Sequence, residues 1–296
     1  MRLLDFLFAL RPLVLVPAWS FFILGWGLLG DAVAFPPDRF LFLSLVLAGV
    51  YLVNQVVDFE SDRINRKGFF LQQGIFTRRL YVAAAGVLLG AGIAGAVVRD
   101  AFPALVVASA FIGLAYSLPP LRLSARPGFD LLANAAGYGL IAVLLGAGRE
   151  ALASAALRSW VAVPAASFLA VAAVFLHTTV MDLDGDRRTG KRTSGVLLGR
   201  ERCVRLAAAC GVAATAAALT SATPVLIVAC AATAALAILA VVRPSFPSRA
   251  VCVGSTILFV LAAALFAPLF LVAIAALALA TRLYYRRRFA LAYPAL

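Results

Sequence analysis

The chain has 296 residues, of which 64% are hydrophobic and only 13% are charged. Soluble globular proteins carry about 25% charged residues, so this composition excludes an ordinary soluble enzyme and indicates an integral membrane protein. The formal net charge of +13 would suit nucleic-acid binding, but the basic residues lie mostly in alternate loops between apolar runs, which indicates membrane topology and no nucleic-acid partner.

Apolar stretches long enough to cross about 30 Å of hydrocarbon recur along the whole chain. Because no extended alternating pattern is present, helices rather than a transmembrane barrel are expected to satisfy the backbone in lipid. We predict an all-α integral membrane protein, a bundle of about nine transmembrane helices around a central cavity. The predicted spans are 12–30, 40–57, 80–98, 104–120, 131–148, 160–181, 206–222, 224–242 and 250–281.

The basic residues predict the orientation of the bundle. If the N-terminus is cytoplasmic, most arginine and lysine residues fall in inside loops, as the positive-inside rule requires. The outside loops then hold only Arg39, Arg99, Arg149 and Arg158. The tail Arg286–Arg288 conflicts with an odd number of spans, unless Pro268 divides 250–281 into two short helices. We expect a multi-pass protein of the bacterial inner membrane, surrounded by membrane lipids, with its active site facing the cytoplasm.

Two acidic clusters of the same form follow directly on apolar runs. The first occupies 54–63 after the span 40–57, and the second occupies 182–187 after the span 160–181. Together they hold six of the thirteen acidic residues of the chain. Charged groups beside a membrane core are costly unless something pairs with them, so the two clusters need a shared purpose.

The spacing of the clusters indicates the chemistry. Asn54, Asp58 and Asp62 stand four residues apart, which places them along one face of a helix, and Asp182 and Asp186 repeat the step. Two carboxylates about 4 Å apart repel by roughly 4 kcal/mol at an effective dielectric near 20, so such rows require cations. Hard oxygen ligands select Mg²⁺, which binds through a few carboxylates together with substrate phosphates. Two facing rows would therefore hold Mg²⁺ against a diphosphate.

Basic residues near the clusters are suited to the remaining phosphate oxygens. The implied substrate has a diphosphate head at the cytoplasmic mouth and a lipid tail among the helices. The candidate basic residues are Arg63, Arg66, Lys67, Arg122, Arg126, Arg187, Lys191 and Arg192.

The repeated clusters also suggest an internal duplication. Each one ends an apolar helix, opens a basic loop and precedes another apolar helix. We therefore predict one transmembrane domain over 1–296, with two related halves at about 1–130 and 131–296 that face a shared cavity.

At these motifs the chain resembles the UbiA superfamily of intramembrane prenyltransferases. Residues 54–62 are similar to the family's N-D-x-x-D-x-x-x-D, with Gln55 in place of the usual second-position Asp. Residues 182–193 are similar to its D-x-x-x-D and to the glycine and Lys-Thr that follow, and residues 116–122 are similar to the Tyr-Ser-x-Pro-Pro segment of several branches. The frequent Y-x-x-x-K motif has no clean match, because Pro120 stands where Lys would be.

The resemblance implies Mg²⁺-dependent transfer of a prenyl group from a polyprenyl diphosphate donor to a small-molecule acceptor, with release of diphosphate. It implies that Asp58, Asp62, Asp182 and Asp186 are catalytic and, with Asn54, hold Mg²⁺. The substrate-binding residues that it implies are Asn54, Arg66, Lys67, Tyr116, Arg122 and Lys191. The acceptor is left open, as is the chain length of the donor.

Other interpretations remain open at this point. A membrane terpene cyclase would use the same diphosphate ionisation, whereas an ion-coupled transporter would more naturally place its acids in mid-helix. Glu60 and Asp184 taken alone equally suit a solvated helix end. His177, one turn before Asp182, suits either an acceptor-orienting base or a hydrogen-bonded interior histidine.

Overall fold

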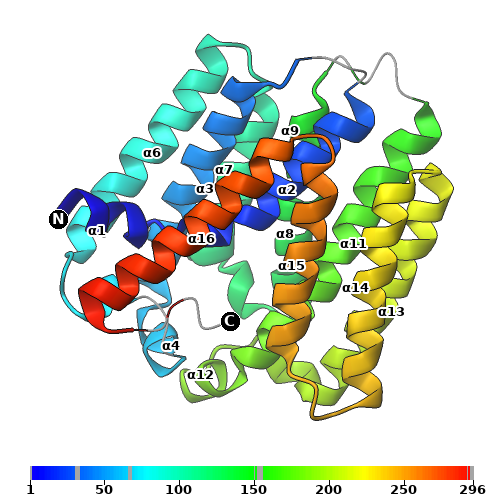
Figure 1. The fold of residues 1–296 in the computed structure, drawn as a ribbon. Helices are drawn as coiled ribbons and strands as arrows, with labels where there is room; N and C mark the ends of the chain where they lie inside the picture. Colours follow the sequence, from blue (N-terminus) through cyan, green and yellow to red (C-terminus); the bar gives the residue numbers. More distant parts are fainter. Residues whose placement is uncertain are drawn as a thin grey trace.

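The computed structural model describes residues 2–30, 34–65, 69–149, 151, 156–291 and 293. Helices account for all regular structure in these residues, and no strand occurs among them, so the prediction of an all-α fold is confirmed. Figure 1 shows the long helices packed side by side in one bundle.

The bundle is built from apolar helices joined by short segments. Its long helices are α2 (Pro12–Leu29), α3 (Pro37–Val57), α6 (Arg78–Val98), α7 (Pro103–Ser117), α11 (Leu157–Met181), α13 (Ser194–Ser221), α14 (Pro224–Val242), α15 (Ser248–Ala264) and α16 (Pro268–Phe289). One further membrane segment consists of α8 (Phe129–Asn134), the π-helical turns η2 (Ala135–Ile141) and α9 (Ala142–Ala147). The short elements are α1 (Arg2–Ala9), α4 (Phe59–Ile64), α5 (Phe69–Gln72), η1 (Leu123–Ala125) and α12 (Leu183–Arg188).

Eight of the described segments are long and apolar enough to cross a membrane, and α7 and α15 are shorter apolar helices. The predicted span 250–281 is wrong as a single helix, because it is divided between α15 and α16. Pro268 explains the division, since proline lacks an N–H for the preceding turn and suits the first position of a new helix.

The division of this span removes the conflict over the basic tail. The end of α16 lies beside α1, where the carboxylate of Asp5 accepts a hydrogen bond from Arg288 Nε at 3.4 Å and another from the Tyr284 hydroxyl. The ring of Phe8 stacks on Tyr284 with centroids 4.1 Å apart. The C-terminal arginines therefore lie on the same side of the bundle as α1.

Two glycines allow α2 and α9 to pack closely. A Cβ at Gly25 in α2 would lie 2.0 Å from the carbonyl oxygen of Val143, and one at Gly146 would lie 1.9 Å from that of Phe22. Small residues of this kind let membrane helices approach closely. The contact between α2 and α9 thus depends on both glycines.

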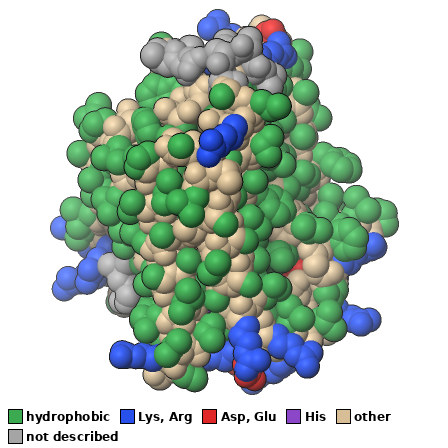
Figure 2. Space-filling view, turned by 90° about the vertical axis from the view of Figure 1, so that its right-hand side faces the viewer, with side chains coloured by type: hydrophobic (Ala, Val, Ile, Leu, Met, Phe, Trp, Pro, Cys, Tyr) green, Lys and Arg blue, Asp and Glu red, His purple; other side chains and the backbone are tan. Residues whose placement is uncertain are grey.

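The outer surface suits a membrane. Figure 2 shows one face on which hydrophobic side chains cover most of the surface, while Lys and Arg gather mainly near its lower edge. The short helices α4 and α12, which carry the acidic clusters, contact each other at the same lower end in Figure 1. The predicted division into two related halves stays a prediction.

Candidate active site

A cavity of about 330 Å³ opens among α2, α3, α11, α15 and the segment from Tyr116 to Tyr138. One end is polar and the other is mostly apolar. The polar end is lined by Asn54, Asp58, Ser61, Asp62, Asn65, Asp182, Asp186, Lys191 and Thr193. The apolar end is lined mainly by Val14, Pro17, Phe21, Ala170, Val171, Val174, Phe175 and Phe259.

Both acidic clusters continue the helical hydrogen bonding of the membrane helix before them. In the first, Asp58 N donates to Asn54 O and Asp62 N donates to Asp58 O, each at 2.8 Å. In the second, Asp186 N donates to Asp182 O at 3.0 Å. The four-residue spacing therefore keeps Asp58 and Asp62, and likewise Asp182 and Asp186, on the wall of the cavity.

Asn65 joins the two clusters. Its side-chain oxygen accepts a hydrogen bond from Gly185 N at 3.1 Å, and its Nδ2 donates to the carbonyl of Asp182 at 3.5 Å. A Cβ at Gly185 would lie 2.4 Å from Asn65 Nδ2, so a larger residue there would displace the Asn65 amide. Sequence reasoning missed Asn65, because its role depends on a partner 120 residues away.

A cation and an amide both hold one oxygen of Asp58. Lys191 Nζ lies 3.0 Å from Asp58 Oδ2, and Asn54 Nδ2 donates to the same oxygen at 2.9 Å. The side chains of Lys191 and Asp58 are only 11% and 9% exposed, so the pair is shielded from solvent. The other oxygen of Asp58, Oδ1, is buried and has no hydrogen-bond partner among the described residues.

The position of Asp186 raises the pKa of its carboxyl group. Burial raises the pKa of Asp186 to about 6, Lys191 opposes that rise, and the neighbouring Asp182 adds to it. Near neutral pH this carboxyl is therefore close to titration, and a cation beside it would favour the charged form.

Asp130, which sequence reasoning also missed, fixes the segment that carries Lys191. Its carboxylate is 1% exposed and accepts hydrogen bonds from Ser194 N at 2.6 Å and from the Ser194 hydroxyl. Ser194 begins α13, and Lys191 and Thr193 precede it on the cavity wall. This contact ties α8 to α13 just beside the acidic clusters.

The sequence model of the UbiA prenyltransferase family matches residues 8–247, which is most of the chain. The chain belongs to the UbiA prenyltransferase family.

Curated relatives and solved structures agree with this assignment. Lycopene elongase/hydratase of Haloferax volcanii is 32% identical over 213 residues, covering 67% of this chain and 68% of that protein. Digeranylgeranylglyceryl phosphate synthase of Halobacterium salinarum is 30% identical over 224 residues, covering 73% and 76%. A UbiA homologue from Archaeoglobus fulgidus, bound to DMAPP and Mg²⁺, superposes with a TM-score of 0.72 at 19% identity, covering 90% of this chain and 97% of that one. At that identity the structural likeness supports the fold alone.

The acidic end of this UbiA-family cavity fits Mg²⁺ without forming a closed cage. No three His, Cys, Asp or Glu side chains among the described residues lie close enough together to hold one ion. Mg²⁺ commonly takes one or two carboxylates and completes its shell with water and substrate phosphates. The unsatisfied Oδ1 of Asp58 is a ligand of the required kind. The residues present therefore fit ions whose coordination a diphosphate would complete.

Only some of the basic residues that the sequence predicts for substrate binding line the cavity. Lys191 lines the cavity, whereas Arg122 is exposed and lies outside the lining residues. Arg66 and Lys67 lie outside the described residues. Arg11, which is not among the basic residues that the sequence predicts for the substrate, also lines the cavity and lies near enough to Asp62 for a favourable electrostatic interaction.

The hydrogen bonds of Gln55 explain why glutamine stands where the family motif has Asp. Its side chain is 2% exposed and lies outside the cavity lining, and its Nε2 donates to Ala9 O at 3.2 Å and Tyr51 O at 3.3 Å. An aspartate could not donate these bonds. The position thus anchors the α1 end of the chain, and the substitution takes no acid from the cavity.

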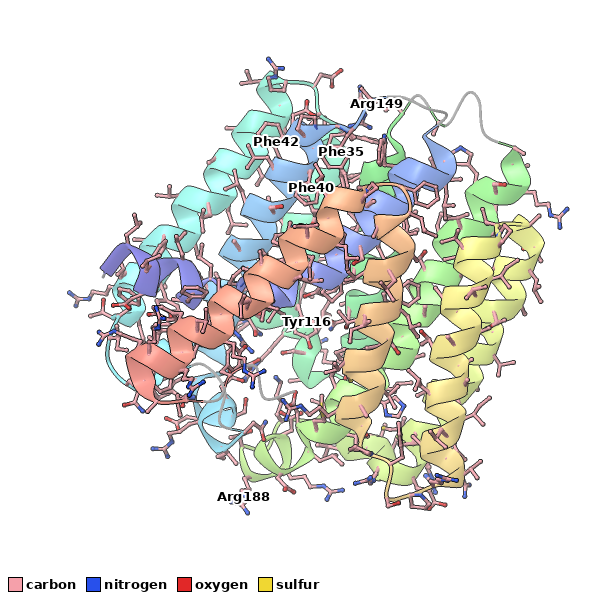
Figure 3. All side chains as sticks on the ribbon, viewed as in Figure 1. Phe35, Phe40, Phe42, Tyr116, Arg149 and Arg188 are labelled. Carbon is pink, nitrogen blue, oxygen red and sulfur yellow. The ribbon has the colours of Figure 1, made fainter. Side chains whose placement is uncertain are left out.

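Other candidate residues are also placed by the structure. Tyr116 lines the cavity and lies centrally in the bundle in Figure 3, whereas Arg188 points away from the lower end. Glu60 is exposed and pairs with Arg63, and Asp184 is exposed. His177 is fully buried beside Ser248, with Nδ1 and Oγ 3.1 Å apart, and lies outside the cavity lining.

Proposed function

We propose that the protein transfers a prenyl group from a polyprenyl diphosphate to an acceptor in a Mg²⁺-dependent reaction that releases diphosphate. The observation that carries this proposal is the cavity itself, in which two facing rows of carboxylates end a mostly apolar chamber. Such a chamber suits a substrate with a charged head and a hydrocarbon tail. Membership of a family of intramembrane prenyltransferases supports a transferase over an ion-coupled transporter.

The reaction is a substitution at the allylic carbon of the donor. The carbon–oxygen bond to the diphosphate breaks, and its electron pair leaves with the diphosphate. A nucleophilic atom of the acceptor forms the new bond to that carbon, and the acceptor loses a proton to water or to a nearby base. When bound, Mg²⁺ would neutralise charge that develops on the leaving diphosphate.

The side chains of this chain have separate tasks in the proposed reaction. Asp58, Asp62, Asp182 and Asp186, with the amide of Asn54, would hold the metal ions. Lys191 would donate to the diphosphate, because its ammonium group already lies among the carboxylates. The rings of Tyr51, Tyr116 and Tyr138, which all line the cavity, would shield the developing allylic cation from water. Arg66, Lys67 and Arg122 stay candidate diphosphate contacts, as the family resemblance implies.

The site is proposed to face the cytoplasm. The acidic helices α4 and α12 lie at the end of the molecule where basic side chains gather, which is the cytoplasmic end under the positive-inside rule. The prediction of a bacterial inner membrane stays a prediction, since the two relatives described above are archaeal.

The proposal is tested by turnover in proteoliposomes. The protein is incubated with Mg²⁺, labelled allylic diphosphates and an acceptor panel that includes lycopene and a prenylated glyceryl phosphate, chosen after the names of the two relatives. We expect a prenylated product and free diphosphate, both lost in excess EDTA and restored by added Mg²⁺. Turnover that persists in EDTA would contradict the metal requirement. A cyclic hydrocarbon formed from the donor alone would indicate a terpene cyclase instead.

A further inference from the structure

Two aromatic rings close the end of the cavity that lies opposite the acids. Phe21 of α2 and Phe259 of α15 both line the cavity, and their ring centroids are 4.7 Å apart at an interplanar angle of 42°. The residues are only 3% and 2% exposed. They form a floor, because the next residues along both helices belong to the packed core and lie outside the lining.

The distance from the acids to this floor is limited by helix geometry. On the α11 side, the lining residues run from Asp182 at the acidic end to Ala170 near the floor. Twelve residues separate them, which corresponds to about 18 Å at the rise of an α-helix. A linear substrate whose head is held by the acids therefore has a fixed length available before it meets the two rings.

The wall along this length is mostly apolar and suits a hydrocarbon chain. Val14, Pro17, Val171 and Val174 line it, and the nearby Thr256 hydroxyl is already bonded to Cys252 O at 2.9 Å. Ser255 is the polar exception, because its buried hydroxyl also lines the cavity and has no hydrogen-bond partner among the described residues. A prenyl tail has no polar atom that would require a partner there. Each added isoprene unit extends the tail towards the floor, and a unit that overlaps the rings must displace side chains in a close-packed core.

We infer that Phe21 and Phe259 set the upper limit on the prenyl chain length of the donor. This inference rests on the proposed function, because it assumes that the diphosphate head lies at the acids. It assigns the donor to a class of allylic diphosphates whose tail ends at the two rings. It also assigns the two rings as specificity-determining residues, remote from the reacting atoms.

The test compares donors of increasing length with one fixed acceptor. The variants are F21A, F259A and the milder F21L and F259L, which keep most of the core volume if the alanine variants fold poorly. Two donors are compared: the best donor of wild type, and the shortest donor that is too long for it. In the floor variants, kcat/KM for the long donor divided by kcat/KM for the best donor should rise by roughly tenfold or more. The reason is that one methylene in a hydrophobic pocket is worth 10- to 200-fold.

Phe22 supplies a matched control. It is the same residue type at the next position of α2 and is fully buried, but it packs against Phe35 and Phe40 and lies outside the cavity lining. Figure 3 shows Phe35 and Phe40 near the upper end of the bundle. F22A should lose stability as F21A does, yet leave the order of preferred donors unchanged.

The outcomes separate this inference from the proposed function. If wild type transfers prenyl groups but the floor variants keep its donor preference, the inference fails and the function stands. If the floor variants change the preference among acceptors at constant donor, the rings contact the acceptor and the inference also fails. If wild type transfers a prenyl group from no donor, the proposed function fails, and the inference that rests on it fails as well.

Discussion

Asp58 combines the features that a metal ligand at a membrane surface requires. One oxygen is held by Lys191 and Asn54, and the other is buried and has no partner among the described residues. A buried polar atom without a hydrogen bond is costly, so this oxygen would gain from a partner outside the protein. A bound cation would satisfy that oxygen and leave the pair with Lys191 in place.

The carboxylates of both clusters should be essential to turnover. We expect Asp58→Asn and Asp182→Asn each to lower product formation by more than about 100-fold, since even the outer partners of metal ligands are typically worth 10- to 100-fold. Mass spectrometry measures the product, and size exclusion in detergent checks folding. Asp184→Asn is the matched control, because Asp184 is in the same cluster but exposed, and it should stay near wild type. Full activity in Asp58→Asn would remove that residue from the mechanism.

Gln55 should contribute to stability and not to metal binding. Gln55→Glu removes the donor to Ala9 O and leaves a buried carbonyl unpaired, so we expect a loss of about 1–3 kcal/mol in unfolding free energy. Thermal unfolding in detergent measures the loss, and Gln73→Glu at an exposed position nearby should be neutral. Higher Mg²⁺ affinity in Gln55→Glu without a loss of stability would show that the side chain reaches the cavity.

At the level of elements, the site depends on how short helices are attached to long ones. The helices α4 and α12 have six residues each and could not be stable alone. They continue the hydrogen bonding of α3 and α11, and Asn65 joins one to the other. The start of α13 is fixed separately by Asp130, so three membrane segments determine where Lys191 lies.

Asp130 should act through the position of Lys191. Asp130→Asn weakens the bonds from Ser194, and a hydrogen bond to a charged group is worth about 1.5–3 kcal/mol. We expect the KM for the diphosphate donor to rise by roughly tenfold or more, with a smaller change in kcat, in steady-state assays.

A double-mutant cycle isolates this effect. Ser194→Ala removes only the hydroxyl bond and should give a smaller rise in KM, and the double variant should be less than additive because the two residues share one contact. Additive effects, or a fall in kcat alone, would show that Asp130 acts elsewhere.

At the level of the whole molecule, the apolar surface and the basic end together define how the bundle is oriented across the membrane. The face in Figure 2 is largely hydrophobic, with basic side chains near the end that carries α4 and α12. The split of 250–281 into α15 and α16 brings the basic tail back to that end, where Asp5 binds Arg288. The loop arginines and the C-terminal arginines therefore agree on one orientation.

Thiol labelling tests this orientation. Arg188 and Arg149 lie at opposite ends of the bundle in Figure 3, and both are exposed. In cells, we expect a membrane-impermeant reagent to label Arg149→Cys from outside and Arg188→Cys only after the membrane is opened. The parent chain, whose four cysteines are buried or half-buried, gives the background. Labelling of Arg188→Cys in intact cells would reverse the proposed orientation.

Periodicity and hydropathy predicted what depends on local order. The membrane helices follow from hydropathy, and the alignment of Asp58 with Asp62 and of Asp182 with Asp186 follows from spacing, since helical geometry fixes residues four apart. The split at Pro268 was left open, although the signal was present in the sequence. The hydrogen bonds of Gln55 could not be predicted, because the motif gives the residue type expected at a position but not the direction of its side chain.

The sequence by itself determined the membrane class, the helices and the acidic rows, because each depends on neighbours within one or two turns. Only the tertiary structure decided that Asn65 bonds to α12 and that Asp130 bonds to the start of α13. It also decided that Arg11 lines the cavity and that the rings of Phe21 and Phe259 are in contact. Each of these contacts joins residues far apart in the chain. The periodicity of a sequence indicates which side chains are buried, but it does not indicate which distant residue each one contacts.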